Sequence, residues 1–344
     1  MTKRCAIISF RLGGTDGVAI IAKTWENVLN TLGWETTTIA GASPDAYPLD
    51  VELEGLAIDA TVPIDEPRLA KALADVDIVL CENILSVPIN LAASRTIARL
   101  LRGRPAIIHH HDLPWQLEQF RDNDALPVDD PAWRHVTINR MTQRELGARG
   151  IESTLIYNGF DTKEPLADRN AARERYRFAD DELVVVHPVR AIRRKNIAAA
   201  TRLAENLDAT YWLTGATENG YDDELATILA ATSCRIVRQT ADSLATMYAA
   251  SDLVVFPSLW EGFGNPPIEA AIHRRLAAVG TYPVSAELRE LGFDWLDPLN
   301  PASVSSALTG DTTARLDHNQ DLAREHFSLD RLTDQVSSLL AAFN

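Results

Sequence analysis

One segment in the second half of the chain has the residue types and spacing of an anion-binding loop. Residues 253–269 have the pattern of a buried strand, a glycine-containing loop and a helix. Gly262 and Gly264 let the backbone approach a ligand closely, and Asn265 followed by Pro266 predicts a helix capped by the asparagine. Free amides and the positive end of the helix dipole favour an anion. We therefore expect a phosphate or polyhydroxyl ligand at this loop.

Two glutamates flank this loop. Glu261 precedes it and Glu269 lies one turn inside the helix, so both can face one cleft from opposite sides of the anion. Such a pair is suited to binding hydroxyl groups. The alternative interpretation is a solvated loop acid and a helix-surface acid.

A second candidate segment is basic. After the apolar run 183–188, four cations occur within six residues, from Arg190 to Lys195, in a chain that is acidic overall. Arg190 can bind phosphate oxygens in a forked geometry and Lys195 can act as a point charge, whereas Arg193 and Arg194 are expected to be exposed. The position at a strand's carboxyl end favours an anion pocket over a solvated basic loop.

A glycine turn follows the first strand. Gly14 and Gly17 match the second half of a GxGxxG fingerprint, but Leu12 stands where the first glycine belongs. The second strand also ends without the acid that binds a ribose in NAD sites, which disfavours a nicotinamide-dependent oxidoreductase. The turn remains suited to a phosphate or to close approach of another domain, or it is simple turn chemistry.

Three adjacent histidines end another strand. Because strand side chains alternate, His109 and His111 can share a face while His110 points away. Without CxxC or HExxH spacing nearby, we expect no metal site. A histidine that contacts a sugar or stabilises charge is favoured over packed histidines.

The elements that position these residues form an α/β pattern. Short apolar runs typical of strands buried on both faces alternate with helical stretches, and the run 18–32 is predicted to be a helix. The expected strands are 6–10, 36–40, 78–81, 106–110, 135–138 and 154–157, then 183–188, 210–214, 235–238, 253–257 and 277–280.

The order of these elements predicts two doubly wound, Rossmann-like domains. Turn chemistry at 157–161 places the boundary between an N-terminal domain, 1–160, and a C-terminal domain, 161–325. Residues 326–344 are expected to form an amphipathic helix that packs back on the first domain, because their apolar positions share one face. These positions are Leu329, Leu332, Val336, Leu339, Leu340 and Phe343.

Composition narrows the function classes. Thirty-three basic and 48 acidic residues give a net charge of −15, which disfavours nucleic-acid partners and anionic membranes. Three distant cysteines without CxxC spacing fit a reducing compartment and core positions. No apolar stretch approaches 18 residues, and the apolar run in residues 1–10 is too short for a signal peptide. We expect a cytoplasmic protein without an integral membrane segment.

Taken in order, these motifs resemble the GT4-type retaining glycosyltransferases, which have the GT-B architecture. The resemblance covers nearly the whole chain: the turn at Gly13 and Gly14, the histidine before Asp112, the segment 158–161, and the two motifs of the second half. Those motifs are Arg190 with Lys195 and Glu261 with Glu269. The family implies two Rossmann-like domains facing a central cleft.

The resemblance also implies residue roles. Arg190 and Lys195 would bind the diphosphate of a nucleotide sugar, and Glu269 would hold its ribose. The amides at Phe263 and Gly264, with the helix start at Asn265, would contact sugar and phosphate, and Gly14 would lie on the donor side. His111, or less favourably His110, would sit by the transferred sugar, and Glu261 beside the reacting face. These assignments are expectations from the family.

The implied reaction moves a hexosyl group to an acceptor hydroxyl with retention and without a metal or other cofactor, because cations and the helix start can neutralise the diphosphate. Alternatives on the same scaffold are a nucleotide-sugar epimerase, a glycoside phosphorylase and a noncatalytic sensor. A soluble acceptor is favoured over a lipid, since no basic amphipathic helix is present. The base, the sugar, the acceptor and the oligomeric state are left open.

Overall fold

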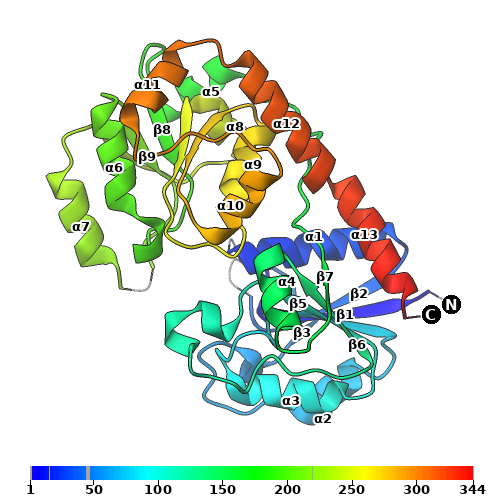
Figure 1. The fold of residues 1–344 in the computed structure, drawn as a ribbon. Coiled ribbons are helices and arrows are strands. Elements are labelled where there is room, and N and C mark those ends of the chain that lie inside the picture. The colour runs from blue at the N-terminus through cyan, green and yellow to red at the C-terminus, as the bar shows by residue number, and fades with distance from the viewer. Residues whose placement is uncertain (1, 15, 44–46, 219, 344) are drawn as a thin grey trace. The chain divides into compact units, whose positions relative to one another are not determined.

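The chain forms two α/β units, each built on its own parallel sheet (Figure 1). The computed structural model describes residues 2–14, 16–43, 47–218 and 220–343. Unit 1 consists of Met1–Gly159 and Leu329–Asn344, and unit 2 of Phe160–Ser328. The chain therefore leaves unit 1 after Gly159 and returns to it with its last helix.

The sheet of unit 1 has the strand order β3-β2-β1-β4-β5-β6-β7, and all neighbours are parallel. Its strands are β1 (Arg4–Arg11), β2 (Glu35–Ala42), β3 (Val51–Glu52), β4 (Ile78–Glu82), β5 (Ala106–His110), β6 (Trp133–Thr137) and β7 (Ser153–Leu155). The winding direction reverses between β1 and β4. The carboxyl ends of these two strands therefore form the switch point at which ligands of such sheets collect.

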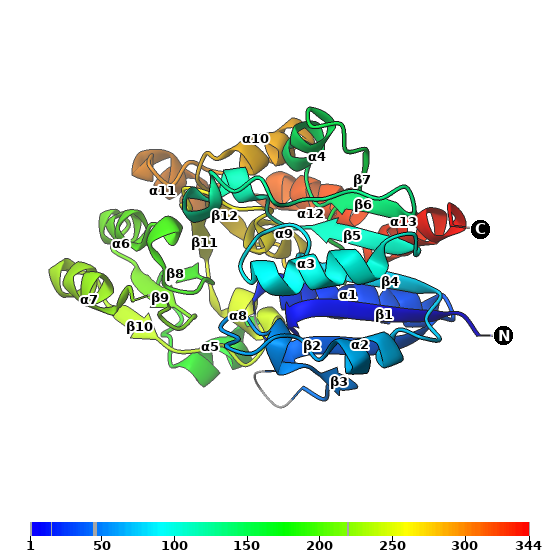
Figure 2. The same cartoon turned by 90° about the horizontal axis from the view of Figure 1, so that it is seen from below.

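Helices cover both faces of this sheet. Figure 1 shows α1 and α13 on one face, and Figure 2 shows α2 and α3 across the other. The helical segments are α1 (Gly17–Thr31), α2 (Glu66–Ala72), α3 (Leu91–Leu101), α4 (Arg140–Gly147), α13 (Leu329–Ala341) and the 3₁₀ turns η2 (Glu54–Leu56), η3 (Pro114–Gln116) and η4 (Glu118–Phe120).

The last helix belongs to the core of unit 1. Its apolar face buries Leu332, Val336, Leu339 and Leu340 in one cluster with Trp25 and its neighbours on α1. Four aliphatic side chains buried in this way contribute several kcal/mol, at roughly 1.5–3 kcal/mol each before the entropy of ordering them is subtracted. The amphipathic pattern predicted from the sequence is the face that packs.

The sheet of unit 2 has the order β10-β9-β8-β11-β12, again with parallel neighbours. Its strands are β8 (Val184–His187), β9 (Thr210–Leu213), β10 (Ile236–Arg238), β11 (Leu253–Phe256) and β12 (Leu276–Val279). The winding reverses between β8 and β11, the two strands that precede the basic segment and the glycine-containing loop. The two anion-binding candidates therefore meet at the switch point of this sheet.

The helical segments of unit 2 include the short turn η5, which contains Lys195. The segments are α5 (Arg169–Tyr176), η5 (Arg193–Lys195), α6 (Ile197–Asn206), α7 (Asp222–Ala231), α8 (Leu244–Ala250), α9 (Asn265–Ile272), α10 (Pro283–Glu290), α11 (Pro301–Thr309) and α12 (Thr313–Phe327). Helix α12 ends at Phe327, whose carbonyl oxygen accepts the Phe160 N–H at 2.8 Å. This bond joins the first residue of the unit to the residue before its last.

The fold class predicted from the sequence is confirmed, because both sheets are parallel and doubly wound. Each expected strand is present within two residues of its predicted ends, whereas β3 was not expected. Cys5 and Cys81 are buried as predicted, but Cys234 is only half-buried. Within the described parts of the chain, no helix combines the length and apolarity that a membrane span needs.

Candidate active site

The loops after β8 and β11 are held together by their own backbone. The Leu259 N–H donates to the Arg194 carbonyl oxygen at 2.9 Å, and the side-chain amide of Asn196 donates to the Pro257 carbonyl oxygen at 3.2 Å. These bonds are possible because β8 and β11 are adjacent in the sheet. The basic segment and the glycine-containing loop thus form one structural element of unit 2.

Lys195 and Glu261 form a buried ion pair at this edge. The Lys195 Nζ donates to Glu261 Oε1 at 2.5 Å, and Arg194 donates to the other carboxylate oxygen and, at 2.8 Å, to the Trp260 carbonyl oxygen. Burial lowers the pKa of Lys195 to about 8, against the raising effect of Glu261. Burial alone would raise the pKa of Glu261, but Lys195 and Arg194 outweigh it and hold that pKa below its usual value. Both partners are therefore charged near neutral pH.

The other arginines of the basic segment have separate partners. Arg190 pairs with Glu218, from the loop after β9, at 2.6 Å, and Arg193 pairs with Glu224 at 2.5 Å while its side chain stays 80% exposed. The expectation that Arg194 is an exposed neighbour like Arg193 is wrong, because it bonds directly to Glu261. The arginine next to Lys195 thus belongs to the ion-pair cluster.

The start of α9 differs in one detail from the prediction. Gly264, not Asn265, is the N-cap residue, and Asn265 is the first helical residue. Gly264 has φ +101°, and a Cβ there would lie 2.4 Å from the Tyr282 hydroxyl, so a glycine is required on two grounds. The Phe263 ring packs within unit 2, 5.7 Å from the Phe327 ring, so any ligand contact of Phe263 must come from its backbone.

Glu269 lies half-buried on α9, where the Tyr248 hydroxyl donates to its Oε2 at 2.7 Å. Burial raises the pKa of Glu269 to about 7, an effect that the Tyr248 hydrogen bond opposes and that Glu164 reinforces. The Tyr248 ring stacks on His273 with centroids 5.0 Å apart. A carboxylate that is held in place and half-buried suits hydroxyl recognition, but it titrates near neutral pH.

In unit 1, the turn after β1 contains the two adjacent glycines. Gly13 has φ +78°, and a Cβ there would overlap the Tyr47 side chain at 2.1 Å, whereas Gly14 is half-buried beside it. Asp16 then caps α1, because its side chain accepts the N–H groups of Val18 and Ala19. The turn is therefore tightly packed, and Gly14 stays a predicted donor-side residue.

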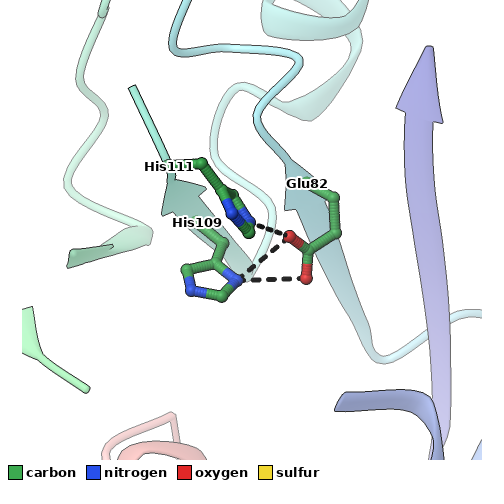
Figure 3. A group of neighbouring side chains, drawn as sticks. All are labelled: Glu82, His109 and His111. Atoms are coloured by element: carbon green, nitrogen blue, oxygen red, sulfur yellow. Dashed lines mark hydrogen bonds and ion pairs between the residues drawn. The ribbon is translucent and has the colours of Figure 1, made fainter. Parts of the chain in front are cut away.

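The predicted division of the three histidines matches the side-chain contacts. His109 and His111 both bond to Glu82, the last residue of β4, from Nδ1 at 3.1 Å and from Nε2 at 2.7 Å (Figure 3). His110 points to other partners, with Nδ1 2.8 Å from the Ser86 hydroxyl and Nε2 2.8 Å from a nitrogen of His135. Sequence reasoning missed Glu82, although a lone acid at the end of an apolar strand was a usable signal.

Two kinds of group in unit 1 have the chemistry of metal ligands. The ligand atoms of Glu82, His109 and His111 all lie within 4.8 Å of one another, so this triad suits a cation by residue type. The sequence also contains two Asp-x-Asp triplets, 75–77 immediately before β4 and 122–124 in the segment between β5 and β6. Both triplets lie in unit 1, whereas the cation cluster lies in unit 2.

Comparison with known proteins relates the segment that carries this geometry to a family of enzymes. Residues 190–297, which contain the cation cluster and α9, match the model of the family described as "Glycosyl transferases group 1". The mannosylglucosylglycerate synthase of Thermotoga maritima is 25% identical, over 97% of this chain and 99% of its own. That of Petrotoga mobilis is also 25% identical, over 84% and 85%.

Solved structures share the fold over the full chain. HepE from Anabaena, in complex with UDP and glucose, has a TM-score of 0.76 and 18% identity, and the match covers 99% of this chain and 100% of that one. Sucrose-phosphate synthase from Thermosynechococcus elongatus has a TM-score of 0.75 and 16% identity, covering 99% and 98%. With two doubly wound units and a group 1 segment at the switch point of the second, the chain has the GT-B architecture and is similar to the group 1 glycosyltransferases of the GT4 type.

Proposed function

We propose that this glycosyltransferase moves a hexosyl group from a nucleotide-diphosphate sugar to an acceptor hydroxyl, with retention of the anomeric configuration and without a metal ion. The observation that carries the proposal is the buried Lys195–Glu261 pair, joined by Arg194, at the β8–β11 switch point beside the start of α9. Cations and helix amides in one place are suited to neutralise a leaving diphosphate.

The charged side chains at this edge of the sheet leave a small net positive charge, which favours binding of an anion. Arg190, Arg194 and Lys195 provide three positive charges, and Glu218 and Glu261 cancel two of them. The positive end of the α9 dipole adds to the remaining charge. The Lys195 ammonium has three N–H donors and gives one to Glu261, so two stay available for phosphate oxygens.

The proposed step exchanges two bonds at the anomeric carbon. The bond from that carbon to the diphosphate oxygen breaks, and the acceptor oxygen bonds to the same face. The acceptor's proton passes to the departing phosphate oxygen. Lys195 and Arg190 stabilise the negative charge on the diphosphate, and Glu269 binds the ribose hydroxyls. Glu261 holds Lys195 and Arg194 in place and supplies negative charge beside the oxocarbenium-like centre, and His111 lies by the transferred sugar.

The relatives support a soluble acceptor. The two curated relatives are named for the synthesis of a mannosylglucosylglycerate, a small sugar acid, and match this chain over most of its length. We propose an acceptor of that general kind, a soluble hydroxyl compound of sugar size. The acidic net charge of the chain agrees with an acceptor that is not a polyanion.

A thermal-shift screen over UDP-, GDP- and ADP-sugars identifies the donor, because a bound donor raises the melting temperature. The transfer product is then followed by NMR from its first appearance. Retention predicts that the new glycoside has the donor's anomeric configuration, and an inverted product would refute the proposed mechanism. An epimerised donor formed without an acceptor would instead indicate an epimerase, and donor binding without transfer or hydrolysis a sensor.

Metal independence is tested on the same reaction. Activity is expected to survive dialysis against EDTA, because protein cations bind the diphosphate. Complete loss that Mg²⁺ or Mn²⁺ restores would overturn this part of the proposal, and the Asp-x-Asp triplets would then be the first residues to substitute.

A further inference from the structure

Glu82 is a fully buried carboxylate with no role in the proposed reaction. It ends β4 beside β1, at the switch point of unit 1, and its side chain has no solvent exposure. A buried carboxylate is costly unless hydrogen bonds compensate for the lost water. The hydrogen bonds that offset the free-energy cost of burying Glu82 at this position come from its two histidine partners.

The donors around Glu82 fix the proton positions on both imidazoles. The Oε1 atom of Glu82 lies 3.1 Å from Nδ1 of His109, and its Oε2 atom lies 2.7 Å from Nε2 of His111. The ionised carboxylate only accepts, so His109 donates from Nδ1 and His111 from Nε2 (Figure 3). In the neutral His111 ring, Nδ1 is then the acceptor nitrogen.

The backbone of His111 is held as firmly as its ring. Its N–H donates to Asn83 Oδ1 at 3.1 Å, and Asn83 itself adopts φ +59°, directly after Glu82. The His109 ring is buried and lies 4.6 Å from that of Trp25. His109 therefore supports Glu82 from the core side, while His111 is oriented by one bond at its ring and one at its backbone.

We propose that Glu82 is a positioning residue that holds His111 as the Nε2–H tautomer, so that Nδ1 accepts a hydrogen bond from a hydroxyl of the transferred sugar. The inference rests on the proposed function, in which His111 lies by that sugar. It adds a residue and a proton assignment that the family resemblance did not provide. The negative charge behind the ring also makes Nδ1 a better acceptor, as carboxylates do for other histidines.

The test replaces Glu82 by glutamine, which keeps the shape but places an NH2 group, with two N–H donors, where one carboxylate oxygen only accepted. We expect kcat/KM for the donor sugar to fall at least about tenfold, as for partners that orient a functional histidine. Affinity for the nucleoside diphosphate without sugar is expected to stay unchanged. The matched control is Glu66→Gln, the same substitution at an exposed carboxylate of unit 1, which is expected to retain activity.

Two further measurements separate positioning from a merely structural role. In a His111→Ala background, Glu82→Gln is expected to cost no further activity, since a residue that acts through His111 has nothing left to orient. Nitrogen-15 NMR of the imidazoles is expected to show His111 protonated at Nε2 in the wild type and a changed tautomer population in Glu82→Gln. The NMR result does not need transfer activity, so it stands or falls separately from the proposed function.

Three results would overturn the proposal. If Glu82→Gln lowers activity as much in the His111→Ala background as in the wild type, Glu82 has a role that is independent of His111. A wild-type His111 protonated at Nδ1 would contradict the proton assignment. A stoichiometric metal ion in the purified wild type that is lost in Glu82→Gln would make the triad a metal centre.

Discussion

Glu269→Gln isolates the charge of the carboxylate that we assign to the ribose. The Glu269 pKa of about 7 means that the group is mostly ionised above neutral pH and mostly protonated below it. Only the ionised form presents acceptors alone to the ribose hydroxyls. We therefore expect wild-type affinity for a nucleotide sugar to fall as the pH drops through about 7, and the Glu269→Gln variant to lack this dependence.

The size of the effect follows from the pKa. With a pKa of about 7, roughly nine tenths of Glu269 is ionised at about pH 8 and roughly one tenth at about pH 6. If binding requires the ionised form, the dissociation constant rises about tenfold between these values, or about 1.4 kcal/mol. Tyr248→Phe removes the bond that favours the ionised carboxylate while keeping the ring stacked on His273, so the midpoint should move to higher pH.

Isothermal titration calorimetry with a nucleotide sugar is the suitable assay, because its diphosphate diester does not titrate in this range as a free nucleoside diphosphate does. A wild-type affinity that stays constant over the range would refute the reasoning. So would a wild-type pH dependence that Glu269→Gln leaves intact, since the titrating group would then lie elsewhere.

The same pKa predicts an opposite effect on stability. The folded-state pKa of Glu269 lies above the ordinary value of 4.5, so its stability contribution is fully present below about pH 4.5 and is lost as the pH rises through about 7. The difference of about 2.5 in pKa amounts to at most about 3 kcal/mol. Glu269→Gln should therefore raise the melting temperature of the ligand-free protein at about pH 8. A lower melting temperature there would show that the carboxylate is not destabilising.

Three further predictions test the rest of the site and the fold. Lys195→Met should lower kcat/KM by roughly 10- to 150-fold, which corresponds to the loss of a charge-assisted contact of about 1.5–3 kcal/mol. Arg193→Met, at an exposed side chain, should lower kcat/KM far less. Equal losses in steady-state kinetics would mean that the basic segment attracts anions only through its overall charge. Gly264→Ala should destabilise the protein by at least about 1 kcal/mol in urea unfolding, and adding Tyr282→Phe should recover only the part due to the clash, not the backbone strain. Leu332→Ala should cost about 3 kcal/mol in the same assay, because this buried side chain lies in the core of unit 1; a change below about 1 kcal/mol would mean that the C-terminal helix is dispensable.

The strands were predictable because buried parallel strands leave short apolar runs between helices. The run at 106–110 coincides with β5, and others are displaced by one or two residues, where hydrogen bonding rather than hydropathy sets the end. The two-residue β3 has no periodicity to detect. Asn265 has good N-cap chemistry, but the left-handed backbone at Gly264 places the cap one residue earlier.

Partners within the site were harder to predict than the residues themselves. Alternation along a strand grouped His109 with His111, yet Glu82 comes from a neighbouring strand 27 residues earlier in the chain. Arg193 and Arg194 are adjacent and chemically identical, so only the fold decides that one reaches solvent and the other Glu261. Such pairings depend on strand order, which a single sequence does not specify.

A chain with net charge −15 must gather cations in one place to bind a diphosphate. The arrangement in unit 2 explains how these cations can lie close together without strong mutual repulsion when no ligand is bound. Lys195 and Arg194 share the carboxylate of Glu261, which offsets their mutual repulsion and the cost of burial. Removing Glu261 should then weaken phosphate binding although it removes a negative charge, because the cations would lose their common anchor. We expect Glu261→Gln to lower both the melting temperature and the affinity for a nucleoside diphosphate. Calorimetry showing tighter binding in this variant would mean that Glu261 acts as a simple electrostatic competitor of the phosphate.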